Sequence, residues 1–120
     1  MSEWNPDDLD AVAAAEEIDI SPEGAPVTPV TIWAVRVDDD LFVRAHNGPG
    51  ALWWRAALAS GRGSVAAAGR EVAVAIEPAD PDLQELVDDA YREKYGASPY
   101  GADMLADAVR ETTLRLRPAP

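Results

Sequence analysis

The chain lacks cysteine entirely and contains a single histidine, His46, among its 120 residues. The absence of cysteine excludes disulfides, zinc–thiolate sites and thiol catalysis, and it is typical of proteins from a reducing compartment. No apolar run approaches the ~20 residues that a membrane-spanning helix needs, and the acidic start MSEWNPDDLD is unlike a signal or transit peptide. We therefore expect a cytoplasmic protein that has no membrane partner.

Basic residues are also scarce. Lys and Arg total 10 against 22 Asp and Glu, which gives a formal net charge of −12. The charge is uneven, because residues 1–29 carry no base whereas residues 30–70 carry five arginines and only three acids. A strongly acidic protein repels the phosphate backbone, so no nucleic-acid partner is expected. An anionic small molecule would be drawn to the middle arginines, and the bland alternative is that the acidity only maintains solubility.

The length and the hydrophobic pattern predict one α+β domain over residues 1–120. Asn5-Pro6-Asp7-Asp8 is typical of a helix start, with a capping Asn and Pro at the first helical position. Alternating and β-branched runs predict strands, and periodic apolar positions predict helices. The predicted strands are 17–21, 27–37, 41–45, 64–68, 71–77 and 112–117, and the predicted helices are 1–16, 51–59, 82–95 and a short one at 102–110.

Hairpin connections between these strands favour an antiparallel sheet, and about six strands favour a small barrel over residues 17–117 with helices outside it. Pro118 is expected to end the last strand. The buried face of the helix at 82–95 is expected to consist of Leu83, Leu86, Val87, Ala90 and Tyr91.

Three familiar kinds of site find little support. The stretch 61–64, GRGS, would follow a helix and open a strand, which is the reverse of a dinucleotide-binding loop. The run 38–40, DDD, has no further ligands at suitable spacing and is interpreted as a hairpin tip, so no metal is expected. A catalytic triad would require a serine on a strand-to-helix elbow and a third partner for His46.

The segment RAHNGPGALWWRAAL, residues 44–58, gives the strongest indication of a binding site. A glycine-rich turn that leads into a helix N-terminus exposes backbone N–H groups at the positive end of the helix dipole, and this favours an anion. Asn47 is expected to cap that helix, with Arg44, His46 and Arg55 nearby in the sequence. The alternative is a plain turn followed by a buried helix.

Tryptophans are concentrated around the same segment. Trp53 and Trp54 lie within it, and Trp33 lies on the predicted strand 27–37. Indole rings stack well on planar ligands, so these three are candidates for one wall of a pocket. The alternative is that they only fill the core or an interface.

The stretch APVTPVTIWAVRVDDDLFVRAHNGPGALWWRAALASGRGSVAAAGREVAVAIEP resembles the split β-barrel superfamily. That superfamily includes the pyridoxamine-phosphate-oxidase-like flavin proteins and the deazaflavin-dependent nitroreductases. The resemblance is strongest to an uncharacterised bacterial domain-of-unknown-function family of that type. It covers about residues 15–117 and rests on the order of a T-P-V strand, a hairpin, a small-residue turn and a helix bearing two tryptophans.

The resemblance implies a binding site for FMN or a deazaflavin. In cofactor-binding relatives, the strand that matches residues 28–31 lies along the flavin-type ring, and the turn that matches residues 45–48 approaches the ribityl phosphate. The cofactor-binding residues expected on this basis, together with the segment described above, are Thr28, Pro29, Val30, Thr31, Trp33, Arg44, His46, Asn47, Gly48, Trp53 and Arg55.

Two departures from the relatives concern the anionic part of the cofactor. Deazaflavin-dependent relatives usually carry a basic stretch just before the T-P strand, whereas here residues 21–25 read SPEGA and place the acid Glu23 there. The basic residues that often hold the FMN phosphate are replaced by His46 and Asn47. The resemblance therefore supports the fold more strongly than it supports the cofactor.

We expect from the resemblance a flavin- or deazaflavin-binding oxidoreductase, nitroreductase-like, that forms a homodimer. The catalytic residue is unassigned, with His46 and Tyr91 as the candidates for a proton donor. The alternative is a non-enzymatic protein that has kept the barrel, lost the cofactor and binds a small molecule or a protein partner in the same groove.

Overall fold

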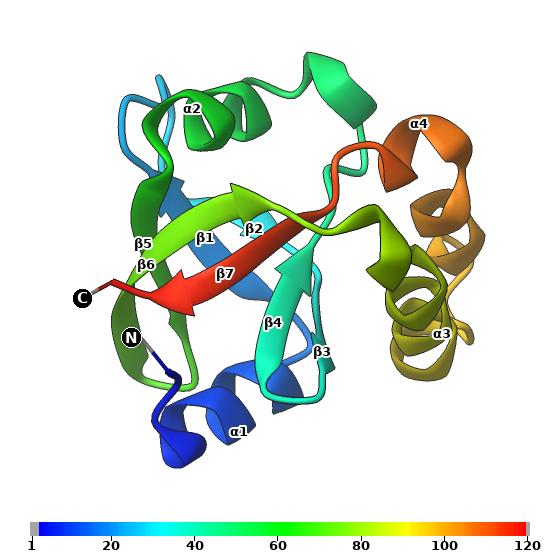
Figure 1. The fold of residues 1–120 in the computed structure, drawn as a ribbon, viewed down its shortest axis with the longest axis horizontal. Coiled ribbons are helices and arrows are strands. Elements are labelled where there is room, and N and C mark those ends of the chain that lie inside the picture. The colour runs from blue at the N-terminus through cyan, green and yellow to red at the C-terminus, as the bar shows by residue number, and fades with distance from the viewer. Residues whose placement is uncertain (1–2, 120) are drawn as a thin grey trace.

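One antiparallel sheet of seven strands forms the centre of the structure, a computed structural model that describes residues 3–119. Its strand order is β2-β1-β5-β6-β7-β4-β3. The sheet curls into a nearly closed barrel with helices around it (Figure 1), which confirms the predicted α+β barrel. The strands are β1 (Ile18–Pro22), β2 (Val30–Ile32), β3 (Ala34–Val37), β4 (Asp40–Val43), β5 (Arg62–Ala67), β6 (Arg70–Pro78) and β7 (Leu114–Pro118).

At Trp33 the chain passes directly from one edge strand of the sheet to the other. β2 and β3 are the edge strands, and this indole is the only residue between them. The prediction of one strand over residues 27–37 is therefore wrong, since 27–29 precede β2 and the remainder divides into two strands on opposite edges. Pro29 has no N–H to donate to a ladder, which explains the late start of β2. The division also explains why seven strands form instead of about six.

The helices lie at both ends and along one side of the barrel. In Figure 1, α1 lies under one end, α2 covers the opposite end, and α3 and α4 lie together at one side. The α-helices are α1 (Pro6–Ala14), α2 (Leu52–Ser60), α3 (Gln84–Tyr95) and α4 (Asp107–Arg110), and the 3₁₀ turns are η1 (Gly48–Gly50), η2 (Pro81–Leu83) and η3 (Gly101–Leu105).

Local signals set the predicted helix boundaries. The Asn5 side chain accepts hydrogen bonds from the backbone N–H groups of Asp7 and Asp8, at 2.9 and 3.3 Å, which confirms the predicted cap of α1. Gly61 ends α2 in the left-handed conformation with φ of 70°. Pro118 ends the last strand, one residue later than predicted, since it is itself the final residue of β7 and pairs with Val74 of β6.

Two apolar cores hold these elements together. The larger core fills the barrel between α1 and α2, and the smaller one lies between the β3–β4 hairpin and α3. The predicted buried face of α3 is only partly right: Val87 and Tyr91 are buried, whereas Leu86 is 48% exposed. Asp88 is buried on this helix instead, because it pairs with a buried arginine.

Candidate functional site

A cavity of about 410 Å³ opens beside Trp33, where the barrel is split. We call it the split cavity. Its volume lies within the usual range of small-molecule sites, roughly 300–1,000 Å³. The lining comes from β2, the turn after β4, the start of α2 and the segment around η3, and it consists of Glu17, Val30, Thr31, Ile32, Trp33, Arg44, His46, Asn47, Trp53, Tyr100 and Met104.

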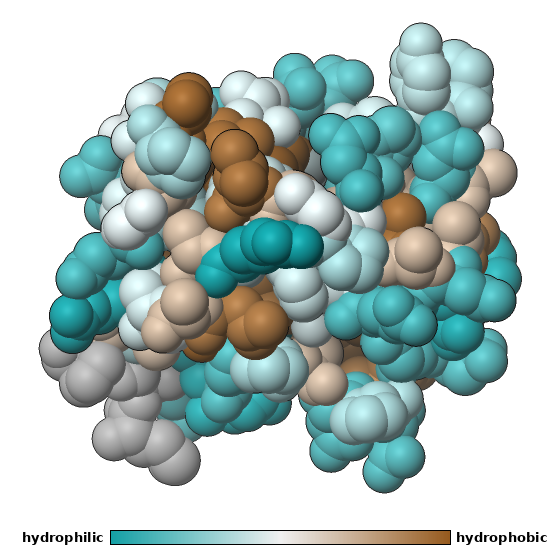
Figure 2. Space-filling model, turned by 90° about the horizontal axis from the view of Figure 1, so that it is seen from above, coloured by the Kyte–Doolittle hydropathy of each residue, from teal (hydrophilic) through white to brown (hydrophobic). Residues whose placement is uncertain are grey.

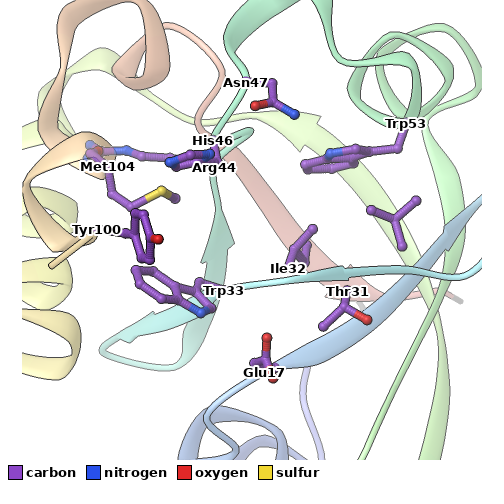
Figure 3. Close-up of a pocket in the computed structure, with 11 residues that line it drawn as sticks. Glu17, Thr31, Ile32, Trp33, Arg44, His46, Asn47, Trp53, Tyr100 and Met104 are labelled. Carbon is purple, nitrogen blue, oxygen red and sulfur yellow. The ribbon is translucent and has the colours of Figure 1, made fainter. Parts of the chain in front are cut away.

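Aromatic rings form the walls of the split cavity. Figure 3 shows Trp53 on one side and Tyr100 with Met104 on the other, and Trp33 lies on the floor near Tyr100. The Trp33 indole is held from behind, since its ring stacks on Tyr95 with centroids 4.1 Å apart and planes 2° apart. Trp53 is 8% exposed, so its orientation is fixed by packing. The predicted ring-stacking wall therefore includes Trp33 and Trp53.

Polar groups lie at the two ends of this space. Asn47 is at one end and Glu17 at the opposite end (Figure 3). His46 lies near Asn47, and its Nε2 is 3.2 Å from Oδ2 of Asp103. The Thr31 hydroxyl donates a hydrogen bond to Asp19 at 2.8 Å and so is engaged within the protein. A ligand with a flat apolar body and polar ends is complementary to this arrangement.

Arg44 does not act as the free cation expected from the sequence. Its side chain is buried, and Nη2 lies 2.7 Å from the Asp88 carboxylate. The three guanidinium nitrogens also donate to Thr113, to the Met104 carbonyl and to Gln84, at 2.9, 2.8 and 2.7 Å. The group therefore fastens α3 and η3 to the barrel, because nearly all its donors are directed at protein acceptors.

The turn at 47–50 also differs from the predicted anion site. Asn47 makes no side-chain capping hydrogen bond, and α2 begins only at Leu52, after the 3₁₀ turn η1. The N–H of Gly48 donates to the Ala45 carbonyl and the N–H of Ala51 donates to the Gly48 carbonyl. Because the turn uses these two donors internally, they do not point at a ligand.

Four of the predicted cofactor-binding residues do not line the split cavity. Thr28 and Pro29 are exposed ahead of β2, and Gly48 is buried within η1. Arg55 is exposed on α2, where its Nε donates to the Pro49 carbonyl at 3.1 Å. Trp54 is also absent from the wall, because its Nε1 donates to the Thr112 carbonyl at 3.0 Å.

Sequence reasoning missed four residues of the lining: Glu17, Ile32, Tyr100 and Met104. Ile32 belongs to the correctly placed strand segment, and Glu17 directly precedes β1. Tyr100 and Met104 lie in the irregular segment before α4, which has no periodicity that shows where its side chains point. The 61% exposure of Tyr100 gives it a surface position that fits a ligand contact.

The two candidate proton donors lie in different environments. Tyr91 is fully buried outside the cavity lining and donates its hydroxyl to the Trp33 carbonyl at 3.1 Å. Burial also raises the pKa of Tyr91 well above its ordinary value, so it holds its proton. His46 is exposed and lines the cavity, which leaves it as the better placed of the two.

Residues 3–119 contain neither a cluster of metal ligands nor a membrane-spanning helix. No group of three or more His, Asp or Glu side chains in this range is placed to hold a metal ion. None of the helices in the same range combines the length and apolar character needed to cross a bilayer.

Comparisons with known proteins agree with this architecture. A family model described as "uncharacterized protein conserved in bacteria" (DUF2255) matches residues 8–116. The chain belongs to the DUF2255 family. This confirms the resemblance to an uncharacterised bacterial family of split-barrel type. No curated protein matches the sequence.

Solved structures show the same fold at low sequence identity. The DUF2255 chain is similar to the conserved hypothetical protein Rv2991 from Mycobacterium tuberculosis, with 13% identity, a TM-score of 0.61, and coverage of 97% of this chain and 79% of that one. It is also similar to an FAD-binding protein from Mesorhizobium loti, with 17% identity, a TM-score of 0.52, and coverage of 98% of this chain and 90% of that one. These likenesses show a shared split-barrel fold, and one of the two neighbours is an FAD-binding protein.

Proposed function

We propose that this protein binds a flavin-type cofactor in the split cavity and acts as a flavin-dependent, nitroreductase-like oxidoreductase. The single observation that carries the proposal is the pair of indoles, Trp33 and Trp53, on the walls of a cavity of about 410 Å³. The similarity to an FAD-binding protein from Mesorhizobium loti supports it.

The residues present fit the ring of such a cofactor. Ile32 and Met104 provide apolar contact, while Trp33, Trp53 and Tyr100 provide flat faces for a planar heterocycle. The stack of Trp33 on Tyr95 holds one of these faces rigidly, which lowers the entropic cost of ordering it around a ligand.

The same residues fit the phosphate of the cofactor poorly. Arg44 is buried against Asp88, and His46 is 3.2 Å from Asp103. The cavity therefore offers suitable contacts to the ring of a flavin but no unpaired positive charge to its phosphate.

A bound flavin would supply the electron-transfer chemistry, whereas the protein would bind, orient and shield it. His46 is the residue that we assign to proton exchange at the rim of the cavity. Its ring is open to solvent, its Nε2 lies 3.2 Å from the Asp103 carboxylate, and imidazole is the side chain most often used for general acid–base catalysis.

The second candidate function is non-enzymatic binding of a small molecule or a protein partner in the same cavity. The observation that favours it is the neutralised Arg44, because FMN and deazaflavins carry phosphate groups that need positive charge. This candidate keeps the barrel and the aromatic walls but needs no cofactor.

Flavin titration of the purified protein separates the two candidates. Its absorbance spectrum would first be recorded, and then tryptophan fluorescence and flavin anisotropy would be followed with riboflavin, FMN and a deazaflavin. Saturable binding at micromolar concentration supports the flavin proposal. If the folded protein binds none of the three, the proposal is wrong and the second candidate stands.

A matched pair of variants tests the location. Trp53→Leu removes a wall of the cavity, whereas Trp54→Leu changes the neighbouring indole on the same helix, which is not part of the lining. We expect Trp53→Leu to weaken flavin binding by about 5- to 150-fold, which corresponds to the loss of a stacking contact of about 1–3 kcal/mol. Trp54→Leu, checked for folding by circular dichroism, should bind as the parent does.

We also propose that the protein forms a homodimer through the outer face of α2. Leu52 and Leu58 are 64% and 45% exposed on this helix, and Val27 is 70% exposed. Figure 2, which looks down on α2, shows apolar side chains among the polar ones on this face. Light scattering coupled to size exclusion would report the mass, and Leu58→Glu should convert a dimer into a monomer.

A further inference from the structure

The positive charge at the split cavity is already neutralised by the protein. Arg44 is the one arginine on the lining, and its guanidinium lies 2.7 Å from the Asp88 carboxylate. The other nitrogen base on the lining, His46, lies 3.2 Å from Asp103. Within residues 3–119, the lining thus offers a ligand no cation that lacks an acidic partner.

Negative charge at the same cavity is less well compensated. Glu17 lies on the wall near Trp33 and forms no ion pair with residues 3–119. The chain as a whole carries a net charge of −12. A ligand phosphate of charge about −1.5 to −2 would therefore enter a negative potential.

We infer that the split cavity selects the uncharged, phosphate-free form of a flavin, with riboflavin as its representative, over the phosphorylated forms FMN and FAD. The inference rests on the proposed function, because it concerns which flavin the same cavity holds. The aromatic walls are common to all three ligands, so the discrimination comes from the charge beyond the ring.

The polar groups of the cavity suit a hydroxylated chain. The carboxylate of Glu17 accepts hydrogen bonds, and the hydroxyls of a ribityl chain donate them. Asn47 lines the cavity, and its amide can both donate and accept without adding charge. Bonds from hydroxyls to a carboxylate are stronger than bonds between neutral groups.

Arg55, on α2, is a competing source of positive charge. It has an exposed guanidinium and no acidic partner within residues 3–119, and its Nε donates to the Pro49 carbonyl. It stands outside the cavity lining. If Arg55 turned inward to meet a phosphate, the selectivity would reverse, so the experiment must include it.

The test is a set of binding titrations with riboflavin, FMN and FAD on the purified chain, at low and high salt. We expect riboflavin to bind on the order of tenfold more tightly than FMN, from one uncompensated unit charge at about 10 Å in a protein environment. FMN affinity should rise with salt because repulsion is screened, whereas riboflavin affinity should stay constant.

Variants assign the discrimination to a particular carboxylate. Glu17→Gln should raise the ratio of FMN affinity to riboflavin affinity several-fold, whereas the α3 surface variant Asp89→Asn should leave that ratio unchanged. FMN binding as tight as or tighter than riboflavin overturns the inference and leaves the proposed function standing. FMN binding that Arg55→Gln abolishes also overturns it. Failure of all flavins to bind overturns both.

Discussion

The indole of Trp33 and the phenol ring of Tyr95 lie face to face, with centroids 4.1 Å apart and planes 2° apart. Trp33 is where the chain passes from one edge of the sheet to the other, and Tyr95 is the last residue of α3. The stack therefore joins the split of the barrel to the helix beside it. It also orients the indole that forms part of the proposed binding site.

The first prediction concerns the ring of Tyr95. Tyr95→Ala should lower the free energy of unfolding by about 3–5 kcal/mol, because a buried aromatic ring is lost. Tyr95→Phe keeps the stack and removes only the hydroxyl, which lies 2.7 Å from the Glu16 carbonyl, so it should cost about 1 kcal/mol. Urea denaturation would measure both values. Equal losses in the two variants would show that the hydroxyl, not the stack, provides the stability.

The second prediction concerns the buried ion pair between Arg44 and Asp88. Asp88→Asn removes the charge that compensates a guanidinium with 0% side-chain exposure, so it should lower the free energy of unfolding by about 3–5 kcal/mol. The matched control is Asp89→Asn, one residue further along the same helix. That variant breaks an exposed pair with Arg92 and should cost less than about 0.5 kcal/mol. Chemical denaturation that gives similar values for both would contradict the assigned role of Arg44.

The buried pair of Arg44 and Asp88 could not be predicted from the sequence. The periodicity of apolar residues predicts that Leu86 is buried on α3, whereas Asp88 is buried instead. Periodicity does not predict a buried Asp88, because its partner Arg44 lies 44 residues earlier in the chain. The two hairpins and the Asn5 cap of α1 follow from local signals and are confirmed, whereas the predicted strand 27–37 and the Asn47 cap are not. The edge-to-edge passage at Trp33 depends on closure of the whole sheet, so no local pattern predicts it.

The candidate site likewise contains residues that local patterns predict and residues that they do not. Trp33, Trp53, His46 and Asn47 come together as expected, because the turn after β4 and the start of α2 are local features that face the β2 segment. Tyr100 reaches the same cavity from a distant irregular segment, and that contact exists only in the folded chain.

The third prediction concerns pH. Burial lowers the pKa of Lys94, the only lysine in the chain, to about 8 from its ordinary value of 10.5. The folded state therefore releases this proton before the unfolded state does, so the free energy of unfolding should rise between about pH 8 and pH 10.5. Denaturant titrations across this range would show the rise, and Lys94→Met should abolish it. NMR of the labelled ε-carbon would give the pKa directly, and a value near 10.5 would contradict the prediction.

The tyrosines act in the opposite direction at higher pH. Burial raises the pKa of Tyr95 from 10.0 to about 12, so the unfolded state loses this proton first and stability should fall above about pH 10. The contributions of Lys94 and the tyrosines together predict that stability is greatest near about pH 9–10. In Tyr95→Phe the decline above pH 10 should be shallower, and an unchanged decline would assign it to other groups.

The fourth prediction compares two asparagines that the sequence presents as helix caps. Asn5 caps α1 with bonds to two backbone N–H groups, so Asn5→Ala should lower the free energy of unfolding by about 1 kcal/mol. Asn47 makes no capping bond and lines the split cavity, so Asn47→Ala should change stability by less than about 0.5 kcal/mol. Its effect should appear in riboflavin affinity instead, where Asn5→Ala has none. The prediction is contradicted if Asn47→Ala loses as much stability as Asn5→Ala and keeps its ligand affinity. The turn at 47–50 would then have a purely structural role.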